Sequence, residues 1–357
     1  MRLRHQQLPV PAGGLPPAFA GGRAVALATT MALASALLTA CADSDATGSD
    51  ATDTVSVGVA GNVFDVPLRV ADTRGYFRKH GLKVDFVTVT ATTGTPSLES
   101  GSLQFLNSSP TGFLDALARG VRETAVGVDG LGNPLGLVVS KDFARRHGLT
   151  ANSPSDEVAR ALAGSVGGFS SANTRAESEI FLKDSKVEPD KVTWVPLPNP
   201  SADRAALRAG RIDWFVTSEP LPLQIQESGD GVVVANSHTV VEWGGSYAGY
   251  GQIVVTRRSY ARQHAAVVRK FMAAVREGTS YLYEHINEPS VVPVAKKALP
   301  GVPGPVVRAS VEEVEWPWFA DMESEVWRKT VDFVRDLGAL PEGADITPED
   351  WSNEYLR

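Results

Sequence analysis

Two short stretches of this chain combine hydroxyl, amide and carboxylate side chains with a proline, directly after an apolar run. They are Asn107-Ser108-Ser109-Pro110 and Thr217-Ser218-Glu219-Pro220. A hydroxyl or carboxylate residue before proline is typical of a helix start, because the side chain caps free backbone amides and proline fits the first turn. Each stretch therefore predicts a polar helix N-terminus at the carboxyl end of a strand, where α/β sheets bind ligands. The polar side chains and free amides of these stretches can form hydrogen bonds to a small polar or anionic solute.

The segments that lead into these two stretches resemble each other. One is SLESGSLQFL, residues 97–106, and the other is ALRAGRIDWF, residues 206–215. In both, the pattern predicts a helix that ends in a small residue and glycine, then a strand of alternating apolar, polar, aromatic and apolar residues. The repeat predicts two similar lobes, and facing strand edges would leave a ligand cleft between hinged lobes.

The remaining sequence alternates strand and helix patterns, which predicts an α/β architecture with two lobes and mostly parallel sheets. A first helix is expected from Leu68 to a glycine cap at Gly81, and an apolar stripe over 268–282 predicts a core helix. Strands are expected at 55–59, 84–89, 103–106, 125–128, 137–139, 166–169, 192–195, 212–216, 232–234 and 253–255. Turn-rich segments near 130–134 and at 244–251 predict the crossings between the lobes. The first lobe is expected at 54–132 and 248–357, and the second at 133–247.

Five loops are expected to line the cleft: 61–66, 92–95, 107–111, 170–175 and 218–219. The candidate solute contacts are Asn62, Phe64, Asp65, Thr93, Gly94, Thr95, Asn107, Ser108, Ser109, Thr111, Asp129, Ser170, Ser171, Asn173, Thr174, Arg175, Ser218 and Glu219. The residues expected to close the cleft are Trp243, Tyr247 and Tyr250. Residues 167–174 precede a helix, so their amides can meet an anion. Alternatively, Ser171 or Asn173 simply caps that helix without a ligand.

The charged residues near these loops leave the charge of the solute open. Arg175 and Arg69 can pair with a sulfonate, nitrate or carboxylate, although either can also be a solvated helix residue. Four carboxylates would repel an anion if they face the cleft: Asp65, Asp129, Glu219 and Glu242. Carboxylates beside Phe64, Trp243 and Tyr247 would instead suit a flat ring with amino groups, such as a pyrimidine.

The N-terminal segment predicts export and anchoring. Arginines at 2, 4 and 23 precede an uncharged run over 24–38, which is typical of a secretory signal and too short to span a bilayer comfortably. The run ends in Leu38-Thr39-Ala40-Cys41, which resembles the lipobox of bacterial lipoproteins. That resemblance implies cleavage after residue 40, a lipid on the Cys41 thiol, and a flexible tether over 41–53 at the extracytoplasmic face of the cell membrane. The alternative is a small buried cysteine behind an ordinary signal peptide.

Composition narrows the class of protein. The chain is 43% hydrophobic, enough for a full core, and its net charge of -7 argues against nucleic-acid binding. Cys41 is the only cysteine, so neither a disulfide framework nor a thiolate metal site is expected. Five scattered histidines lack ligand spacing: His80, His147, His238, His264 and His285. No metal, no cofactor and a monomer are expected.

Four stretches together resemble the periplasmic-binding-protein superfamily, and within it the sulfonate, nitrate, taurine and thiamine-precursor binding proteins of ABC importers. They are Ala71-Asp72-Thr73-Arg74-Gly75-Tyr76-Phe77 with Gly81-Leu82-Lys83-Val84, residues 97–105, residues 162–167 and residues 206–213. The resemblance implies a type II fold of two α/β lobes, the first interrupted by the second, with a solute held between them. It also implies delivery of the solute to a permease and an ATPase, without catalysis. The loop over 91–96 departs from the family pattern, which leaves the ligand open.

The expected function is therefore a lipid-anchored, extracytoplasmic solute-binding protein of an ABC importer, for a small sulfonate-, nitrate- or taurine-like solute. A thiamine-precursor pyrimidine or another aromatic solute is the alternative. Related folds include a pyrimidine synthase and a menaquinone-pathway dehydratase, but this chain has no cysteine beyond Cys41 for a cysteine-dependent reaction. A surface receptor that feeds no transporter is a third possibility, which adjacent permease and ATPase genes would distinguish.

Overall fold

The computed structural model describes residues 52–357 except 91 and 345. The predicted signal peptide, Cys41 and nearly all of the predicted tether lie outside the described residues. Residues 49–357 form one unit, which contains both sheets described below. No helix in the described part of the chain is both long enough and apolar enough to cross a membrane.

The first sheet has five strands in the order β2-β1-β3-β10-β4, and only β10 runs antiparallel to its neighbours. The strands are β1 (Asp53–Val59), β2 (Leu82–Thr88), β3 (Phe105–Ser108), β4 (Glu123–Leu131) and β10 (Tyr250–Arg257). The α-helices of this part are α1 (Val66–Thr73), α2 (Tyr76–Lys79), α3 (Gly94–Glu99), α4 (Pro110–Ala118), α11 (Arg258–Gln263), α12 (Ala265–His285), α13 (Val291–Ala298), α14 (Gly304–Glu312) and α15 (Ser324–Asp336). Short 3-10 turns are η1 (Val63–Asp65), η4 (Pro348–Asp350) and η5 (Glu354–Leu356).

The second sheet repeats this arrangement, with the order β7-β6-β8-β5-β9 and β5 as its antiparallel strand. Its strands are β5 (Leu135–Ser140), β6 (Val166–Phe169), β7 (Thr193–Pro196), β8 (Trp214–Ser218) and β9 (Gly231–Asn236). The helices and 3-10 turns are α5 (Lys141–His147), α6 (Ser155–Leu162), α7 (Ala172–Asp184), η2 (Pro189–Lys191), α8 (Pro200–Arg208), α9 (Leu221–Ser228), η3 (Val241–Trp243) and α10 (Gly245–Ala248).

The internal repeat falls on equivalent parts of the two sheets. The first copy contains the end of α3 and the start of β3, and the second contains the end of α8 and the start of β8. Both strands are the central strand of their sheet. Gly101 and Gly210, which follow the two helices, have φ angles of 84° and 67°, a left-handed conformation that glycine adopts readily. The predicted helix-glycine-strand pattern is therefore confirmed in both places.

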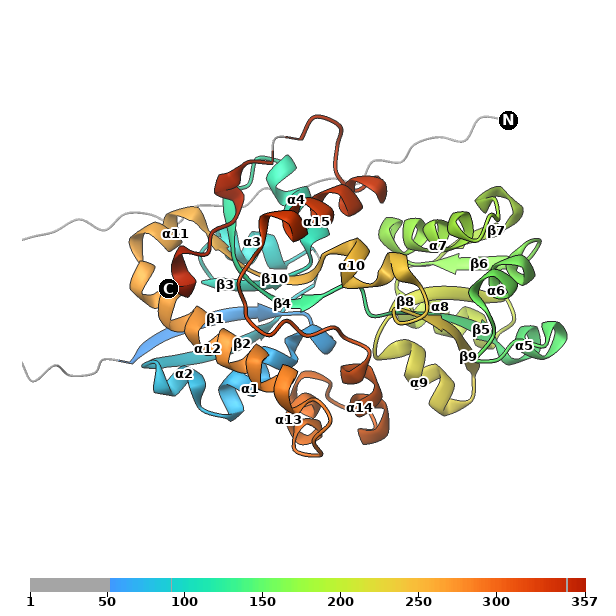
Figure 1. The fold of residues 1–357 in the computed structure, drawn as a ribbon, viewed down its shortest axis with the longest axis horizontal. Helices are drawn as coiled ribbons and strands as arrows, with labels where there is room; N and C mark the ends of the chain where they lie inside the picture. Colours follow the sequence, from blue (N-terminus) through green and yellow to red (C-terminus); the bar gives the residue numbers. More distant parts are fainter. Residues whose placement is uncertain (1–51, 91, 345) are drawn as a thin grey trace, which may run out of the picture. The chain divides into compact units, whose positions relative to one another are not determined.

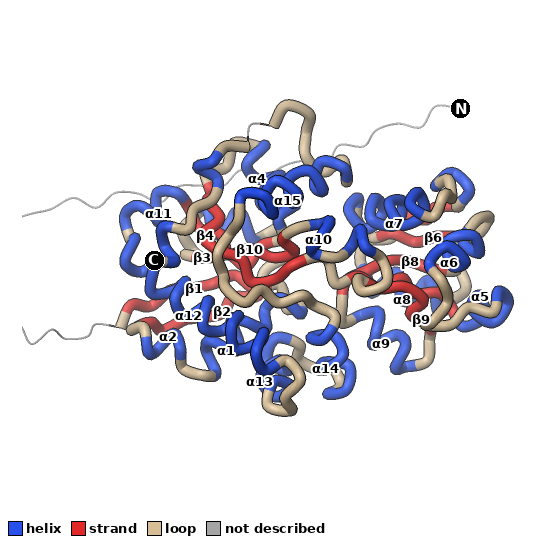
Figure 2. The backbone as a smooth tube through the Cα atoms, viewed as in Figure 1, coloured by secondary structure: helices blue, strands red, loops and turns tan. Residues whose placement is uncertain are grey.

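Helices cover both faces of each sheet (Figure 1). On one face of the first sheet, Phe271 of α12 stacks on Phe105 with ring centroids 3.8 Å apart. On the other face, Phe113 of α4 meets Trp327 of α15. In the second sheet, α5, α6 and α7 bury one face, and α8 and α9 bury the other. Figure 2 shows the strands of each sheet enclosed between helices, which is the predicted α/β class.

The chain crosses between the sheets twice, from β4 to β5 and from β9 to β10, and the two crossings are bonded to each other. The Gly132 amide donates to the Gly249 carbonyl at 2.8 Å, and the Asn133 amide donates to the Trp243 carbonyl at 2.7 Å. A Cβ atom on Gly251 would lie 1.8 Å from the Gly132 carbonyl oxygen, so only glycine permits this approach. The two crossings therefore form a single junction between the sheets.

Two local predictions are wrong. The first helix is not continuous to Gly81, because Gly75 at φ 77° interrupts it and divides α1 from α2. The start of α9 also differs from the prediction: Pro220 precedes the helix instead of occupying its first position, and this N-cap residue makes no side-chain cap bond. The Glu219 side chain still accepts from the Leu223 amide in the first turn of α9 at 3.5 Å, and Ser310 donates to it at 3.2 Å.

Candidate functional site

A hollow of about 450 Å³ lies where the carboxyl ends of the first sheet's strands meet helix α7 of the second. We call it the main hollow. Its lining is rich in hydroxyl and amide side chains and comprises Ala60, Asn62, Val89, Thr90, Gly94, Thr95, Leu106, Asn107, Ser108, Ser109, Thr111, Gly112, Asp115, Arg119, Asn173, Gln252 and Ala339. Its volume is within the range of small-molecule sites.

The start of α4 supplies one wall of the main hollow. Strand β3 ends at Ser108, and Ser109 then adopts an extended conformation and caps the helix by accepting from the Gly112 amide at 3.2 Å. Pro110 occupies the first helical position. The cap therefore forms as predicted, and the Thr111 amide is one of the first helix amides, which have no partner within the helix.

The start of α7 brings the second lobe to the same hollow. Ser171 and Thr174 form a capping box, with the Thr174 amide 3.1 Å from Ser171 Oγ. Ala172 and Asn173 follow the cap, and their backbone amides belong to the first turn of α7, where they have no partner within the helix. Asn173 lines the main hollow. Both helices direct the positive end of their dipole towards this region, which favours a partial or full negative charge there.

A smaller hollow of about 210 Å³ lies beside the junction of the two crossings. Its lining comprises Asn62, Val63, Phe64, Ser109, Thr111, Asn133, Pro134, Ser171, Asn173, Thr174, Glu177, Ser218, Glu219, Gly251 and Gln252. Five of its lining residues also line the main hollow: Asn62, Ser109, Thr111, Asn173 and Gln252. The two hollows are therefore contiguous parts of one site between the lobes.

The floor of the site is fixed by a turn around Asp65. The Asp65 carboxylate accepts from the Gly61 and Asn62 amides at 2.6 and 3.1 Å, and Asn107 Nδ2 donates to it at 3.0 Å. Phe64 lies against β4, since a Cβ atom on Gly130 would meet its ring at 2.3 Å. Asp65 is buried and lies outside the lining of both hollows, so its role is to hold the turn that presents Asn62.

Buried carboxyl groups around the site are shifted towards their neutral forms. Burial raises the pKa of Glu177 to about 8, and burial together with the nearby Glu313 raises the pKa of Glu219 to about 8. Burial also raises the pKa of Asp129 well above its ordinary value, and that of Asp65 despite its hydrogen bonds. At neutral pH the two glutamates are therefore mostly protonated and add little negative charge to the lining.

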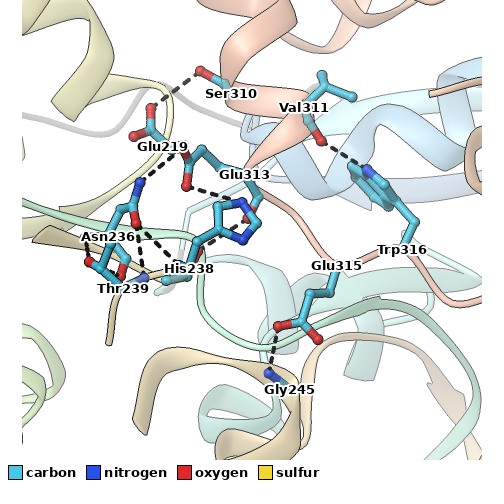
Figure 3. A network of polar contacts seen from close by, with 11 residues as sticks. Glu219, Asn236, His238, Thr239, Gly245, Ser310, Val311, Glu313, Glu315 and Trp316 are labelled. Carbon is cyan, nitrogen blue, oxygen red and sulfur yellow. Dashed lines mark hydrogen bonds and ion pairs between the residues drawn. The ribbon is translucent and has the colours of Figure 1, made fainter. Parts of the chain in front are cut away.

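A segment of the C-terminal region connects the two lobes near this site (Figure 3). Glu313 accepts from Asn236 of β9 at 3.1 Å and lies 3.5 Å from His238, while Ser310 of α14 donates to Glu219 at 3.2 Å. Glu315 accepts from the Gly245 amide at 3.1 Å, and its carbonyl accepts from the Leu131 amide of β4. Residues 310–315 therefore contact both sheets and the return crossing, and we call them the C-terminal clasp.

The three aromatic side chains predicted to close the cleft do not reach it. Trp243 is fully buried in the core of the second lobe, where its indole donates to the Glu177 carbonyl at 3.3 Å. Tyr250 is buried in the first lobe and contacts the Glu323 backbone. Tyr247 is exposed but packs edge-on against Phe333. Trp243 and Tyr250 are therefore packed into the two lobes, and Tyr247 lies on the surface against α15.

The two predicted arginines are also engaged elsewhere. Arg175 pairs with Glu179 of its own helix at 2.6 Å, and its guanidinium lies 3.8 Å from the centre of the Trp194 ring. Arg69 lies 3.8 Å from the centre of the Phe86 ring. Ser170, Thr93 and Asp129 likewise lie outside the lining, and the Thr93 hydroxyl accepts from the Thr90 amide at 2.9 Å.

Several lining residues were not predicted. Gln252 is buried and lines both hollows from the antiparallel strand β10, and Glu177 and Asn133 line the smaller one, with 3.4 Å between Asn133 Nδ2 and Glu177 Oε1. In the main hollow, Arg119 pairs with Asp115 at 2.6 Å. The signal for Gln252 is a lone polar residue inside an apolar strand, whereas Arg119 follows a helix and looks solvated in the sequence.

Among the described residues, no group of three histidine, cysteine, aspartate or glutamate side chains is placed to hold a metal ion. The donors that line the site are hydroxyl groups, carboxamides, helix amides and the Arg119 guanidinium, which suit an oxygen-rich polar solute.

Two five-stranded α/β lobes with a polar site between them define the two-lobed periplasmic-binding-protein fold. The sequence family described as "NMT1/THI5 like" matches residues 65–288, more than half of the chain, and the chain belongs to that family. No curated protein matches the chain in sequence.

Solved structures share the fold at low sequence identity. The periplasmic aliphatic sulphonate binding protein SsuA from Escherichia coli has a TM-score of 0.66 and 18% identity, over 85% of this chain and 99% of that one. The alkanesulfonate-binding protein SsuA from Xanthomonas axonopodis pv. citri, bound to MOPS, has a TM-score of 0.63 and 18% identity, over 84% and 98%. The periplasmic nitrate-binding protein NrtA from Synechocystis PCC 6803 has a TM-score of 0.61 and 15% identity, over 81% and 83%.

Proposed function

We propose that this protein is the solute-binding component of an ABC importer, and that it captures a small organic oxyanion, such as a sulfonate, between its two lobes. The observation that carries the proposal is the convergence of α4 from the first lobe and α7 from the second on one hollow, through Ser109, Thr111 and Asn173. A solute that contacts both helix starts would hold the lobes together, which is how a two-lobed protein couples binding to closure. The similarity to sulfonate- and nitrate-binding proteins supports the same solute class.

The state of the carboxyl groups agrees with an anionic solute. Glu177 and Glu219 line the smaller hollow, and with pKa values of about 8 they are mostly neutral at pH 7. A protonated carboxyl group donates a hydrogen bond to an oxyanion instead of repelling it. Arg119 adds positive character at the edge of the main hollow, although Asp115 neutralises part of it.

The lining of this site fits an aromatic solute less well than an oxyanion. Stacking on a pyrimidine ring needs an aromatic side chain in the lining. Phe64 supplies one in the smaller hollow, while Trp243, Tyr247 and Tyr250 lie elsewhere. The lining also supports an enzyme role less than a binding role, because the described lining residues include no histidine, cysteine or lysine to activate a nucleophile.

We further propose that Cys41 carries a lipid anchor at the extracytoplasmic face of the membrane, that the protein acts as a monomer, and that the lobes divide near residues 132 and 248. The anchor would keep the closed, loaded form close to its permease and ATPase. Sheet membership supports these boundaries, since β5–β9 form one sheet and the remaining strands form the other.

The test is a thermal-shift screen of the purified protein against alkyl and aryl sulfonates, taurine, nitrate, aromatic carboxylates and aminopyrimidines, followed by calorimetry on each hit. A solute that binds the native state raises the melting temperature. We expect an oxyanion to be the strongest hit, and a Thr111→Pro variant, which removes one first-turn amide, to weaken it. A hit confined to aminopyrimidines would favour the aromatic alternative, and no hit from any class would argue against the proposal.

A further inference from the structure

A second pocket, of about 460 Å³, lies outside the site between the lobes. We call it the arginine pocket, and it is lined by Glu99, Val121, Arg122, Arg257, Arg258, Ser259, Arg262 and Glu349. Arg257 ends β10 opposite Glu123, the first residue of β4. Because β4 runs in the same direction as β1 and β3, this pocket lies at the end of the first sheet that is remote from their carboxyl ends and from the main hollow.

Three of the four arginines that line the arginine pocket make no ion pair in the described part of the chain. Arg258 is engaged, since it is paired with Asp350 and lies 3.7 Å from Glu349. Within residues 52–357, apart from 91 and 345, no ion pair involves Arg122, Arg257 or Arg262. The Nε atom of Arg257 is buried without a hydrogen-bond partner. Three guanidinium groups therefore share the pocket with one further carboxylate, Glu99.

The pocket lies beside the point where the N-terminal segment joins the fold. Strand β1 begins at Asp53, which pairs with Lys270 at 2.8 Å. The Tyr260 ring lies 5.9 Å from the Arg257 guanidinium. Burial and the nearby Asp53 carboxylate raise the pKa of Tyr260, and the nearby Arg257 lowers it, so the ring is close to both the start of β1 and the pocket. Figure 1 shows α11, which carries Tyr260, at the end of the sheet where β1 begins.

We propose that the arginine pocket binds a phosphate group, supplied either by the headgroup of an anionic phospholipid or by a free phosphate in solution. Several guanidinium groups around one cavity match the tetrahedral, multiply charged oxygens of phosphate, because each guanidinium can donate two parallel hydrogen bonds. Ser259 adds a hydroxyl donor to the lining. A planar, singly charged carboxylate would leave at least one of the three guanidinium groups without a partner.

The lipid source rests on the anchor proposed at Cys41. A lipid on that residue would tether the chain to the membrane through the segment that enters the fold at Asp53, which is at the same end of the first sheet as the arginine pocket. Basic groups near an anionic membrane surface each contribute about 1 kcal/mol of attraction. The pocket would then orient the tethered protein with its solute site away from the lipid surface.

The experiment compares the wild-type full chain with Arg122→Gln/Arg262→Gln, in which both changed side chains are exposed. The matched control is Arg145→Gln/Arg211→Gln, which removes the same charge from exposed positions of the second lobe. One arm measures binding of inorganic phosphate and glycerol phosphate by calorimetry. The other measures cosedimentation with phosphatidylcholine vesicles prepared with or without phosphatidylglycerol. Thermal melting of each variant verifies that it is folded.

We expect Arg122→Gln/Arg262→Gln to weaken phosphate binding by about tenfold or more, and the control to leave it unchanged. If the same variant also loses the preference for phosphatidylglycerol, the phospholipid source is supported. If that preference persists, the pocket takes a free phosphate and the membrane source is wrong. Phosphate binding that is absent from the wild type, or that survives in Arg122→Gln/Arg262→Gln, overturns the proposal. Calorimetry with phosphate needs neither a lipid on Cys41 nor the transported solute. A negative phosphate result would therefore overturn the arginine pocket proposal without bearing on the proposed solute-binding function.

Discussion

Replacing Glu177 with glutamine tests whether a protonated carboxyl group is buried at the junction of the lobes. Glu177 is on α7, is buried, and has Asn133 Nδ2 3.4 Å from its Oε1 atom. Burial alone raises its pKa from 4.5 to about 8. Glutamine has nearly the same shape and is neutral at every pH, so the substitution removes the titration and preserves the packing.

The size and sign of the effect follow from the two pKa values. In the unfolded chain the carboxyl group loses its proton near pH 4.5, whereas in the folded protein it keeps it until about pH 8. Between these values the folded state binds the extra proton, so the free energy of unfolding falls as the pH rises, by about 1.4 kcal/mol per pH unit. From pH 5 to pH 7 the wild type should therefore lose about 2 to 3 kcal/mol that Glu177→Gln retains.

The assay is urea-induced unfolding followed by tryptophan fluorescence at pH 5 and pH 7. The quantity compared is the change in unfolding free energy between the two pH values, which cancels any constant cost of the glutamine. Glu157→Gln on α6, an exposed position in the same lobe, is the matched control and should keep the wild-type dependence. Identical pH dependence of Glu177→Gln and the wild type would refute the reasoning, because Glu177 would then be ionised when folded.

Four further predictions concern the site, the core beside it and the anchor. The affinity for an anionic solute should fall as the pH rises through about 8, because Glu219 and Glu177 then ionise beside it. Calorimetry at pH 7 and pH 9 should show a smaller fall in affinity for Glu219→Gln than for the wild type. An equal fall in both proteins would contradict this account. Trp243→Ala should destabilise the protein by about 3 to 5 kcal/mol in urea unfolding, because the side chain is fully buried. Tyr247→Ala should leave solute affinity unchanged, because its ring packs against Phe333. A clear loss of affinity in Tyr247→Ala would show that this ring contacts the solute. Cys41→Ala should move the protein from the membrane to the soluble fraction without changing solute affinity, and its retention in washed membranes would argue against the anchor.

The fold could be predicted because local patterns and tertiary packing agree there. Alternating apolar residues form the strands, and the repeated helix-glycine-strand pattern marks the central strand of each sheet. Ser109 with Pro110 is a local signal too, since a cap needs only the next few residues of the chain. These features depend on neighbours in sequence, which the sequence displays directly.

The aromatic residues of the return crossing could not be predicted in the same way. Glycine-rich sequence around Trp243 and Tyr250 is typical of an exposed turn, yet both side chains are buried. Their partners come from distant segments: Phe181 packs on Trp243, and Glu323 contacts Tyr250. Arg175 shows the same limit, because its guanidinium lies 3.8 Å from the centre of the Trp194 ring on β7. Long-range contacts decided the outcome at these positions.

The negative charge proposed for the solute illustrates why residue type alone does not define a binding site. Glu219 in the sequence argues against an anion, but the folded chain places it beside Glu313 in a buried position, which favours its neutral form. Positive potential at the main hollow comes instead from the first amides of α4 and α7, which any sequence with suitable caps can present. An anion-binding site can therefore be built from residues that look acidic and neutral in the sequence. The decisive variables are burial and helix direction, and the burial of Glu219 arises only when Ser310 and Glu313 of the first lobe pack beside it.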